Sequence, residues 1–194
     1  MKPPVNITRQ DLEFSERQIQ ACESWVPADL QEELNMVLRA DVFKPSSTVA
    51  LSGRFELVPV QTHGHWQRLL DLRCAIEVPF GIMDVEQVRG LIKDIHTKHN
   101  RLRGRWYLAR YADAQGVNWV GSIGMIPFHK VETQWMRLQD VDIIPAYQGQ
   151  GLGRYLLRSA CEKAFMEGAV AVGLRAVSTG WVKDWYQRFG FEVL

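Results

Sequence analysis

A glycine-rich turn at residues 148–153 is the feature that most constrains how this chain folds. An apolar segment, residues 141–144, precedes the turn and ends at Pro145, which has no N–H to donate within a strand ladder. The glycines accept positive φ and leave room for close approach of a ligand. The segment that follows is expected to be a helix, whose first N–H groups are unpaired and whose dipole is positive at that end. A strand, turn and helix in this order predict a main-chain binding site for a phosphate or pyrophosphate.

The spacing of the glycines distinguishes among phosphate-binding turns. The chain has G-x-G-x-G rather than the G-x-G-x-x-G of dinucleotide-binding turns, and no Lys-Ser/Thr pair follows for a nucleoside triphosphate. From Gln148 through Gly151 to Gly153 the turn has the pattern Q-x-x-G-x-G. This pattern resembles the coenzyme A pyrophosphate loop of the GCN5-related N-acetyltransferases, the GNAT family, in which the first residue is Arg or Gln. The preceding apolar strand resembles the fourth strand of that family.

A second resemblance lies near the C-terminus. Residues 185–191, Trp-Tyr-Gln-Arg-Phe-Gly-Phe, resemble the family ending Y-E-K-x-G-F, in which a helix carries the tyrosine and a glycine ends the helix. The resemblance covers residues 54–194, which are expected to form the acetyltransferase domain. Residues 1–50 lie outside it and are expected to be an N-terminal helical extension with a linker.

Composition narrows the class of protein. The chain has 194 residues, 46% of them hydrophobic, which suits a single domain with a sizeable core. A net charge of +1 gives no indication of binding to nucleic acid or to an anionic membrane. Cys22, Cys74 and Cys161 form no CxxC pair, as expected of reduced thiols in a cytoplasm. No apolar leader or membrane-length apolar run is present, so a cytoplasmic location is expected.

Periodicity and turn residues predict an α/β fold with a central mixed sheet flanked by helices, in agreement with the resemblance. Helices are expected at residues 10–22, 28–39, 65–77, 84–99, 152–167 and 181–189. Strands are expected at residues 55–60, 106–111, 117–128, 133–144, 169–177 and 191–194, and a linker at 44–47. Gly121 and Gly124 indicate bulges or close packing within their strand.

The end of the sheet departs from the family pattern. The family has one more strand after the one expected at 191–194, so the final strand is short or missing here. Because an uncovered edge strand invites aggregation, either the N-terminal extension or a partner subunit is expected to fill this place. A homodimer through the extension or through the sheet edge is therefore one of the alternatives.

The resemblance implies acetyl-CoA as cosubstrate. The strand at 141–144 would splay from its parallel neighbour near 172–174, and the pantetheine arm would pair with the backbone of Val141 and Ile143. The N–H of Val141 or Asp142 would polarise the thioester carbonyl. The pyrophosphate would be held by the turn, comprising Gln148, Gly149, Gln150, Gly151, Leu152, Gly153 and Arg154. Thr179 stands where the family often has an asparagine that contacts the coenzyme.

Acyl transfer to an amine needs a neutral nucleophile, a donor for the oxyanion and a proton for the leaving thiolate. Tyr186 stands at the place of the family's general acid; the alternative is a tyrosine whose ring belongs to the core. Asp140 and Asp142 are two residues apart on the central strand and so share a face. A partly desolvated carboxylate there would act as the base, and the alternative is a structural carboxylate. His129 and Glu132 are weaker candidates, and water is another carrier of the proton.

The acceptor site expected from the resemblance consists of residues 77–83 and 127–133. The apolar residues expected in or beside these segments are Phe80, Met83, Phe128 and Trp135, whereas Glu77 and Asp84 would favour a cationic amine. His63 and His65, and likewise His96 and His99, have the spacing of metal ligands. No Cys or carboxylate cluster completes either pair in the sequence, so no metal is expected.

These observations predict an acetyl-CoA-dependent N-acetyltransferase that acts on a primary amine of a small molecule by direct attack in a ternary complex. Transfer to a protein lysine or N-terminus is one alternative. The other is a non-catalytic acyl-CoA-binding module whose N-terminal helices carry an interaction.

Overall fold

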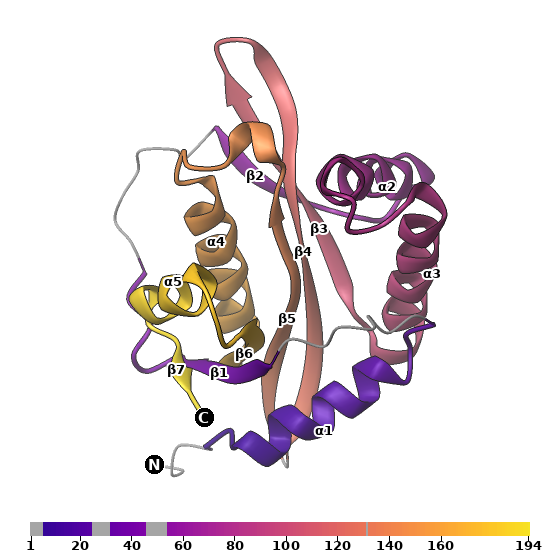
Figure 1. Ribbon diagram of the computed structural model, residues 1–194. Coiled ribbons are helices and arrows are strands. Elements are labelled where there is room, and N and C mark those ends of the chain that lie inside the picture. The colour runs from indigo at the N-terminus through magenta and orange to yellow at the C-terminus, as the bar shows by residue number, and fades with distance from the viewer. Residues whose placement is uncertain (1–5, 25–31, 46–53, 131) are drawn as a thin grey trace.

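A computed structural model describes residues 6–24, 32–45, 54–130 and 132–194 of the chain. The described strands form one mixed sheet in the order β2-β3-β4-β5-β6-β1-β7, in which the β5–β6 pair is parallel and the other pairs are antiparallel (Figure 1). The strands are β1 (Glu33–Arg39), β2 (Phe55–Pro59), β3 (Arg105–Asp113), β4 (Gly116–Lys130), β5 (Thr133–Ile143), β6 (Ala169–Val177) and β7 (Glu192–Val193). The helices are α1 (Arg9–Gln20), α2 (His63–Glu77), α3 (Val85–Leu102), α4 (Leu152–Met166) and α5 (Trp181–Phe189), with short 3-10 helices η2 (Val78–Phe80) and η3 (Pro145–Tyr147). The predicted mixed α/β fold is confirmed.

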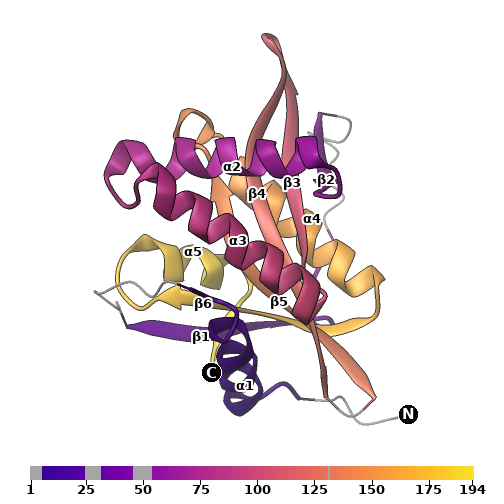
Figure 2. The same cartoon turned by 90° about the vertical axis from the view of Figure 1, so that its right-hand side faces the viewer.

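Helices cover both faces of the sheet. Figure 1 shows α4 and α5 on one side, and Figure 2 shows α1, α2 and α3 on the other. One buried cluster joins the sheet to α4 and α5, and it includes Leu156, Ala160 and Tyr186. A second cluster joins it to the other three helices through residues such as Leu12 and Ile95. In the described residues, no helix has the length and apolarity to cross a membrane.

Side chains fix the ends of the helices. Asp84, the N-cap of α3, accepts a hydrogen bond from the backbone N–H of Gln87 at 2.8 Å, and the Gln87 side chain accepts one from the Asp84 N–H. Gly190 ends α5 with a φ of 115°, a conformation that favours glycine. Gly168, which follows the C-cap of α4, has a φ of 88°.

The helix predicted at residues 28–39 is wrong. Residues 25–31 lie outside the described part of the chain, and residues 33–39 form β1, which pairs with both β6 and β7. Met36, Val37 and Leu38 are all buried because β1 is an inner strand with a core on each face. The N-terminal region therefore fills the sheet position that the sequence left open. Of the linker expected at 44–47, residues 46 and 47 also lie outside the described part.

The two strand glycines allow β4 to pack closely, as predicted. A Cβ at Gly121 would lie 2.3 Å from the carbonyl oxygen of Asp142, and one at Gly124 would lie 2.6 Å from the Trp106 ring. The β4–β5 register shifts between these glycines. Opposite the shift, Asp140 adopts a φ of 51°, so β5 bends shortly before the residues that enter the site.

Candidate active site

The parallel strands β5 and β6 separate partway along the sheet. Their pairing runs from Gln134 with Ala169 to Arg137 with Gly173 and then ends. Beyond this rung, β5 stays bonded to β4 and β6 stays bonded to β1. The predicted splay is present, and it begins four residues earlier than residue 141. Among the strands that the structure describes, none pairs with the backbone of Val141.

The glycine-rich turn presents a row of unpaired donors at the start of α4. Gly149 and Gly151 have φ values of 74° and 81°, and Gly151 is the N-cap of the helix. Within the described ranges, the backbone N–H groups of residues 149–153 have no hydrogen-bond acceptor. A Cβ at either glycine would meet no atom within 4 Å, so the space above the turn is open. Arg154, exposed on the first turn of α4, adds positive charge beside these donors.

Gln148 holds the turn to the end of β5. Its side-chain Nε2 donates to the carbonyl oxygen of Ile143 at 2.9 Å, so this side chain fixes the strand against the loop. Thr179, which follows β6, is exposed. The neighbouring Ser178 is held by Glu32, because its backbone N–H donates to the Glu32 carbonyl at 2.7 Å.

Tyr186 lies in the core of the α4–α5 face and packs its ring against Trp185 and Phe191, at centroid distances of 4.9 and 5.6 Å. Burial raises the pKa of its hydroxyl, and the negative charge of Asp142 adds to the rise. The hydroxyl has no hydrogen-bond partner in the described residues. A tyrosine in this environment stays protonated at neutral pH and has a proton to donate.

Asp142 is bound by an arginine that sequence reasoning missed. Arg73 of α2 is 6% exposed and forms ion pairs with Asp142 and with Glu77, one turn further along its own helix. Burial raises the pKa of Asp142, whereas the charge of Arg73 opposes the rise. Its spacing in the sequence is a signal for this placement, because Arg73 comes four residues after Leu69 and lies on the same buried face of α2.

Asp140 has a different role from Asp142. It sits at the bend of β5 and accepts a hydrogen bond from the indole Nε1 of Trp106 at 3.1 Å. Its charge still acts on Arg73, together with those of Asp142 and Glu77. Asp142 and Glu77 thus pair with one buried guanidinium and the charge of Asp140 acts on it from further along β5, so this region is rich in negative charge.

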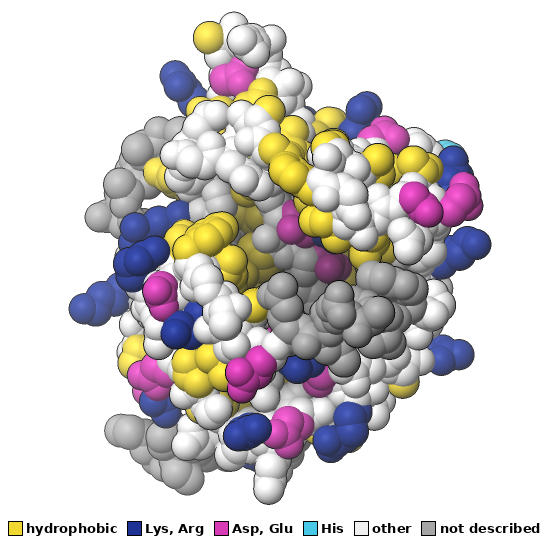
Figure 3. All heavy atoms as spheres, viewed as in Figure 1, with side chains coloured by type: hydrophobic (Ala, Val, Ile, Leu, Met, Phe, Trp, Pro, Cys, Tyr) yellow, Lys and Arg dark blue, Asp and Glu magenta, His cyan; other side chains and the backbone are white. Residues whose placement is uncertain are grey.

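The surface is hollowed between the α4–α5 side and α2, and acidic side chains show within the hollow (Figure 3). The turn after α2 was predicted to line the acceptor site, and it presents exposed apolar side chains, namely Val78, Phe80, Ile82 and Val85. The other predicted wall is wrong. Residues 127–130 belong to β4, and Phe128 stacks on Trp135 in the core at 5.3 Å.

The weaker base candidates lie away from the splay. His129 and Glu132 are at the β4–β5 hairpin, and ten residues of strand separate Glu132 from Asp142, roughly 30 Å along β5. The histidines with ligand-like spacing serve other contacts: His96 stacks on Trp66 at 3.7 Å, and His99 Nδ1 lies 2.7 Å from the Gly104 carbonyl. No group of three or more potential metal ligands occurs in the described part of the chain.

Residues 103–193, which extend from the end of α3 to β7, match the acetyltransferase (GNAT) domain. This part of the chain is therefore similar to a GNAT acetyltransferase domain, and the resemblance predicted from the sequence is confirmed.

Several solved structures share this fold. A conserved protein of unknown function from Staphylococcus epidermidis superposes with a TM-score of 0.58 at 16% identity, covering 98% of this chain and 65% of that one. A glucosamine N-acetyltransferase region of a fungal multi-domain GH3 beta-N-acetylglucosaminidase superposes with a TM-score of 0.58 at 12% sequence identity. The match covers 97% of this chain and 22% of that one. A Trypanosoma brucei acetyltransferase superposes with a TM-score of 0.50 at 19% sequence identity, and the match covers 71% of this chain and 92% of that one. No curated protein matched.

Proposed function

We propose that this chain is an N-acetyltransferase that transfers the acetyl group of acetyl-CoA to a primary amine of a small molecule, by direct attack in a ternary complex. The observation that carries the proposal is the row of free N–H groups at residues 149–153, next to strands that separate after Arg137 and Gly173. Donors of this kind at a helix N-terminus suit a pyrophosphate. The unpaired edge of β5 suits the amide groups of a pantetheine arm.

The chemistry assigned to the site is amine attack on a thioester. The amine nitrogen bonds to the thioester carbon, and the C–S bond of the tetrahedral intermediate then breaks. A backbone N–H of Val141 or Asp142 would donate to the developing oxyanion. Tyr186 would give its proton to the departing thiolate, since its raised pKa keeps it protonated. The ammonium group would first lose one proton to Asp142, directly or through water, which frees the lone pair for attack, and the second proton would leave the nitrogen of the intermediate and restore Tyr186 through water.

The proposed acceptor is a cationic amine that carries an apolar group. Asp140, Asp142 and Glu77 outnumber the single cation Arg73 among them, which favours a positive ligand. The exposed apolar residues of the turn after α2, which include Phe80 and Ile82, offer a surface for the rest of such a molecule. A lysine side chain on a protein is the competing acceptor.

The experiment is thiol release from acetyl-CoA with a panel of amines, amino acids, polyamines, aminoglycosides and peptides, combined with calorimetry of acetyl-CoA binding. We expect release that depends on a small cationic amine. Release with peptides alone would move the assignment to protein acetylation. Binding of acetyl-CoA without release from any amine would indicate a non-catalytic binding module, and no binding would overturn the proposal.

A further inference from the structure

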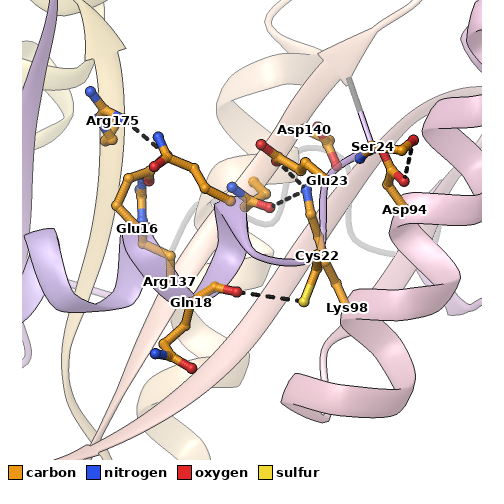
Figure 4. A network of polar contacts seen from close by, with 12 residues as sticks. Glu16, Gln18, Cys22, Glu23, Ser24, Asp94, Lys98, Arg137, Asp140 and Arg175 are labelled. Carbon is orange, nitrogen blue, oxygen red and sulfur yellow. Dashed lines mark hydrogen bonds and ion pairs between the residues drawn. The ribbon is translucent and has the colours of Figure 1, made fainter. Parts of the chain in front are cut away.

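A carboxylate from the N-terminal helix connects the two strands that separate. Glu16 of α1 lies 2.8 Å from Arg137 of β5 and 2.9 Å from Arg175 of β6 (Figure 4). The contacts are between charged groups, and hydrogen bonds to charged groups are shorter and stronger than neutral ones. Glu16 is thus bonded at once to β5 and to β6.

The position of this bridge is specific. Arg137 belongs to the last rung of the β5–β6 pairing, opposite Gly173, and Arg175 lies two residues beyond that rung. Glu16 therefore spans the two strands where their own hydrogen bonds end. A Cβ at Gly173 would lie 2.5 Å from Leu12, so α1 also packs directly on this point.

The bridge that Glu16 forms between Arg137 and Arg175 is required because Arg137 is buried. Arg137 is 2% exposed, and its guanidinium needs a carboxylate because an unpaired buried charge is costly. Burial disfavours the charged form of Glu16, but the guanidinium groups of Arg137 and Arg175 hold its pKa below the usual range. The carboxylate is therefore ionised at neutral pH and pairs with both arginines.

Other N-terminal residues complete the arrangement. Arg175 also pairs with Glu33 of β1, at 3.2 Å. Just after α1, Glu23 binds Lys98 at 2.7 Å (Figure 4). Lys98 also donates to Gln139 of β5 at 3.0 Å. Residues of the N-terminal region thus contact both β5 and β6 near the point where the two strands separate.

We propose that Glu16 is a positioning residue, which sets the separation of β5 and β6 and thereby shapes the groove that receives acyl-CoA. The inference rests on the proposed function, since it assigns the groove to acyl-CoA. In this proposal α1 contributes to the binding groove, although α1 precedes residues 103–193, the part of the chain that matches the GNAT domain. Glu16 acts through the strands and touches no reacting atom.

The test compares Glu16→Gln and Arg175→Gln with the wild-type chain by calorimetry with acetyl-CoA and by amide hydrogen exchange. Arg175→Gln is the milder change, because Glu16 remains to pair with buried Arg137. We expect the Kd for acetyl-CoA to rise about tenfold in both variants, a typical size for coupling between distant sites. Exchange is expected to become faster at residues 134–137 and 172–175 and to stay unchanged in the β3–β4 hairpin.

Ile19→Ala is the matched control, because Ile19 is a fully buried residue of α1 that contacts the second core cluster and does not pair with either arginine. It lowers stability without touching the bridge, so its affinity for acetyl-CoA should match that of wild type. Equal weakening in all three variants would show a general stability effect and overturn the inference. So would wild-type affinity in both Glu16→Gln and Arg175→Gln.

The two proposals fail in different ways. Absence of acetyl-CoA binding by the wild-type chain would overturn the proposed function and, with it, the assignment of the groove to acyl-CoA. The exchange measurement would then still decide the role of Glu16, because unchanged exchange at residues 134–137 and 172–175 would overturn the bridge without reference to any ligand.

Discussion

Tyr186 combines a buried ring with a hydroxyl that has no hydrogen-bond partner among the described residues. Removing a hydroxyl of this kind changes little in the packing of the ring, so its effect on the reaction can be separated from its effect on the fold. Asp142 differs, because its pairing with Arg73 makes it both a structural and a chemical group. Tyr186 is therefore the residue that tests the chemistry most cleanly.

Tyr186→Phe is expected to lower kcat on the order of a hundredfold, which is the smaller end of what general acids contribute. Thiol release from acetyl-CoA measures the loss, and the free energy of unfolding should change by about 0.5 kcal/mol or less. Tyr107→Phe is the control: burial raises the pKa of Tyr107 as well, but this residue lies beside Arg105 and Lys163. Equal activity of Tyr186→Phe and Tyr107→Phe would remove Tyr186 as the acid.

Gly151→Ala tests the phosphate loop. A side chain at a φ of 81° costs about 1–2 kcal/mol, and its methyl group enters the open space above the free N–H groups. We expect the affinity for acetyl-CoA, measured by calorimetry, to fall about tenfold. Gly168→Ala has similar strain, with a φ of 88° and equally open space, but it lies at the other end of α4. If both variants lose affinity equally, the loop is not the binding site.

The sequence predicts some of these residues and not others. Tyr186 and the turn at 148–153 are recognisable because backbone conformation and spacing are local properties, carried by adjacent glycines and a helix end. Arg73 was missed because a single arginine in a helix usually faces water. Arg73 shares the buried face of α2 with Leu69, and this spacing can be read locally. Its partner Asp142, however, is 69 positions away in the sequence.

At the scale of elements, the attachment of α1 to the sheet depends on ionised Glu16. Because the folded state holds the pKa of Glu16 below its usual range, the stabilisation is present above the unfolded pKa of about 4.3 and is lost as pH falls through the folded value. Glu16→Gln should therefore be destabilising at pH 7, and this difference should shrink below pH 4. Urea unfolding at both pH values measures it.

Glu13→Gln provides the comparison for this pH dependence. Glu13 lies on the same helix and pairs with Arg9 at the surface, where ion pairs contribute little. Its effect on the free energy of unfolding should be within about 0.5 kcal/mol at both pH values. A Glu16→Gln effect that stays constant from pH 7 to acid would contradict the pairing with Arg137 and Arg175.

The element that sequence analysis assigned wrongly is β1. Leu34, Val37 and Leu38 have helical spacing, yet Leu34, Met36 and Leu38 alternate equally well over seven residues. So short an apolar segment is decided by its partners, and β6 and β7 are more than 120 positions away. In contrast, α3 was predicted well because its spacing persists over several turns and its cap is local.

At the scale of the whole molecule, β1 joins the N-terminal region to the last strands of the chain. We expect removal of residues 1–45 to abolish stable folding, because Met36, Val37 and Leu38 are buried and each contributes about 1.5–3 kcal/mol. This sum approaches the total stability of a typical domain. Removal also uncovers the edge of β6, so size-exclusion chromatography should show aggregates. A folded, monodisperse remainder would show that the N-terminal region is a dispensable appendage.

The position of β1 in the sheet has a consequence for folding during translation. Residues 33–39 are synthesised some 130 residues before β6, the strand beside which they lie. At ribosomal rates this interval is on the order of ten seconds. During that time the nascent chain carries an apolar strand whose neighbours have not yet been translated. The sheet is completed only when β6 and β7 emerge, so residues 33–39 are translated well before their native partners and are among the last to pair.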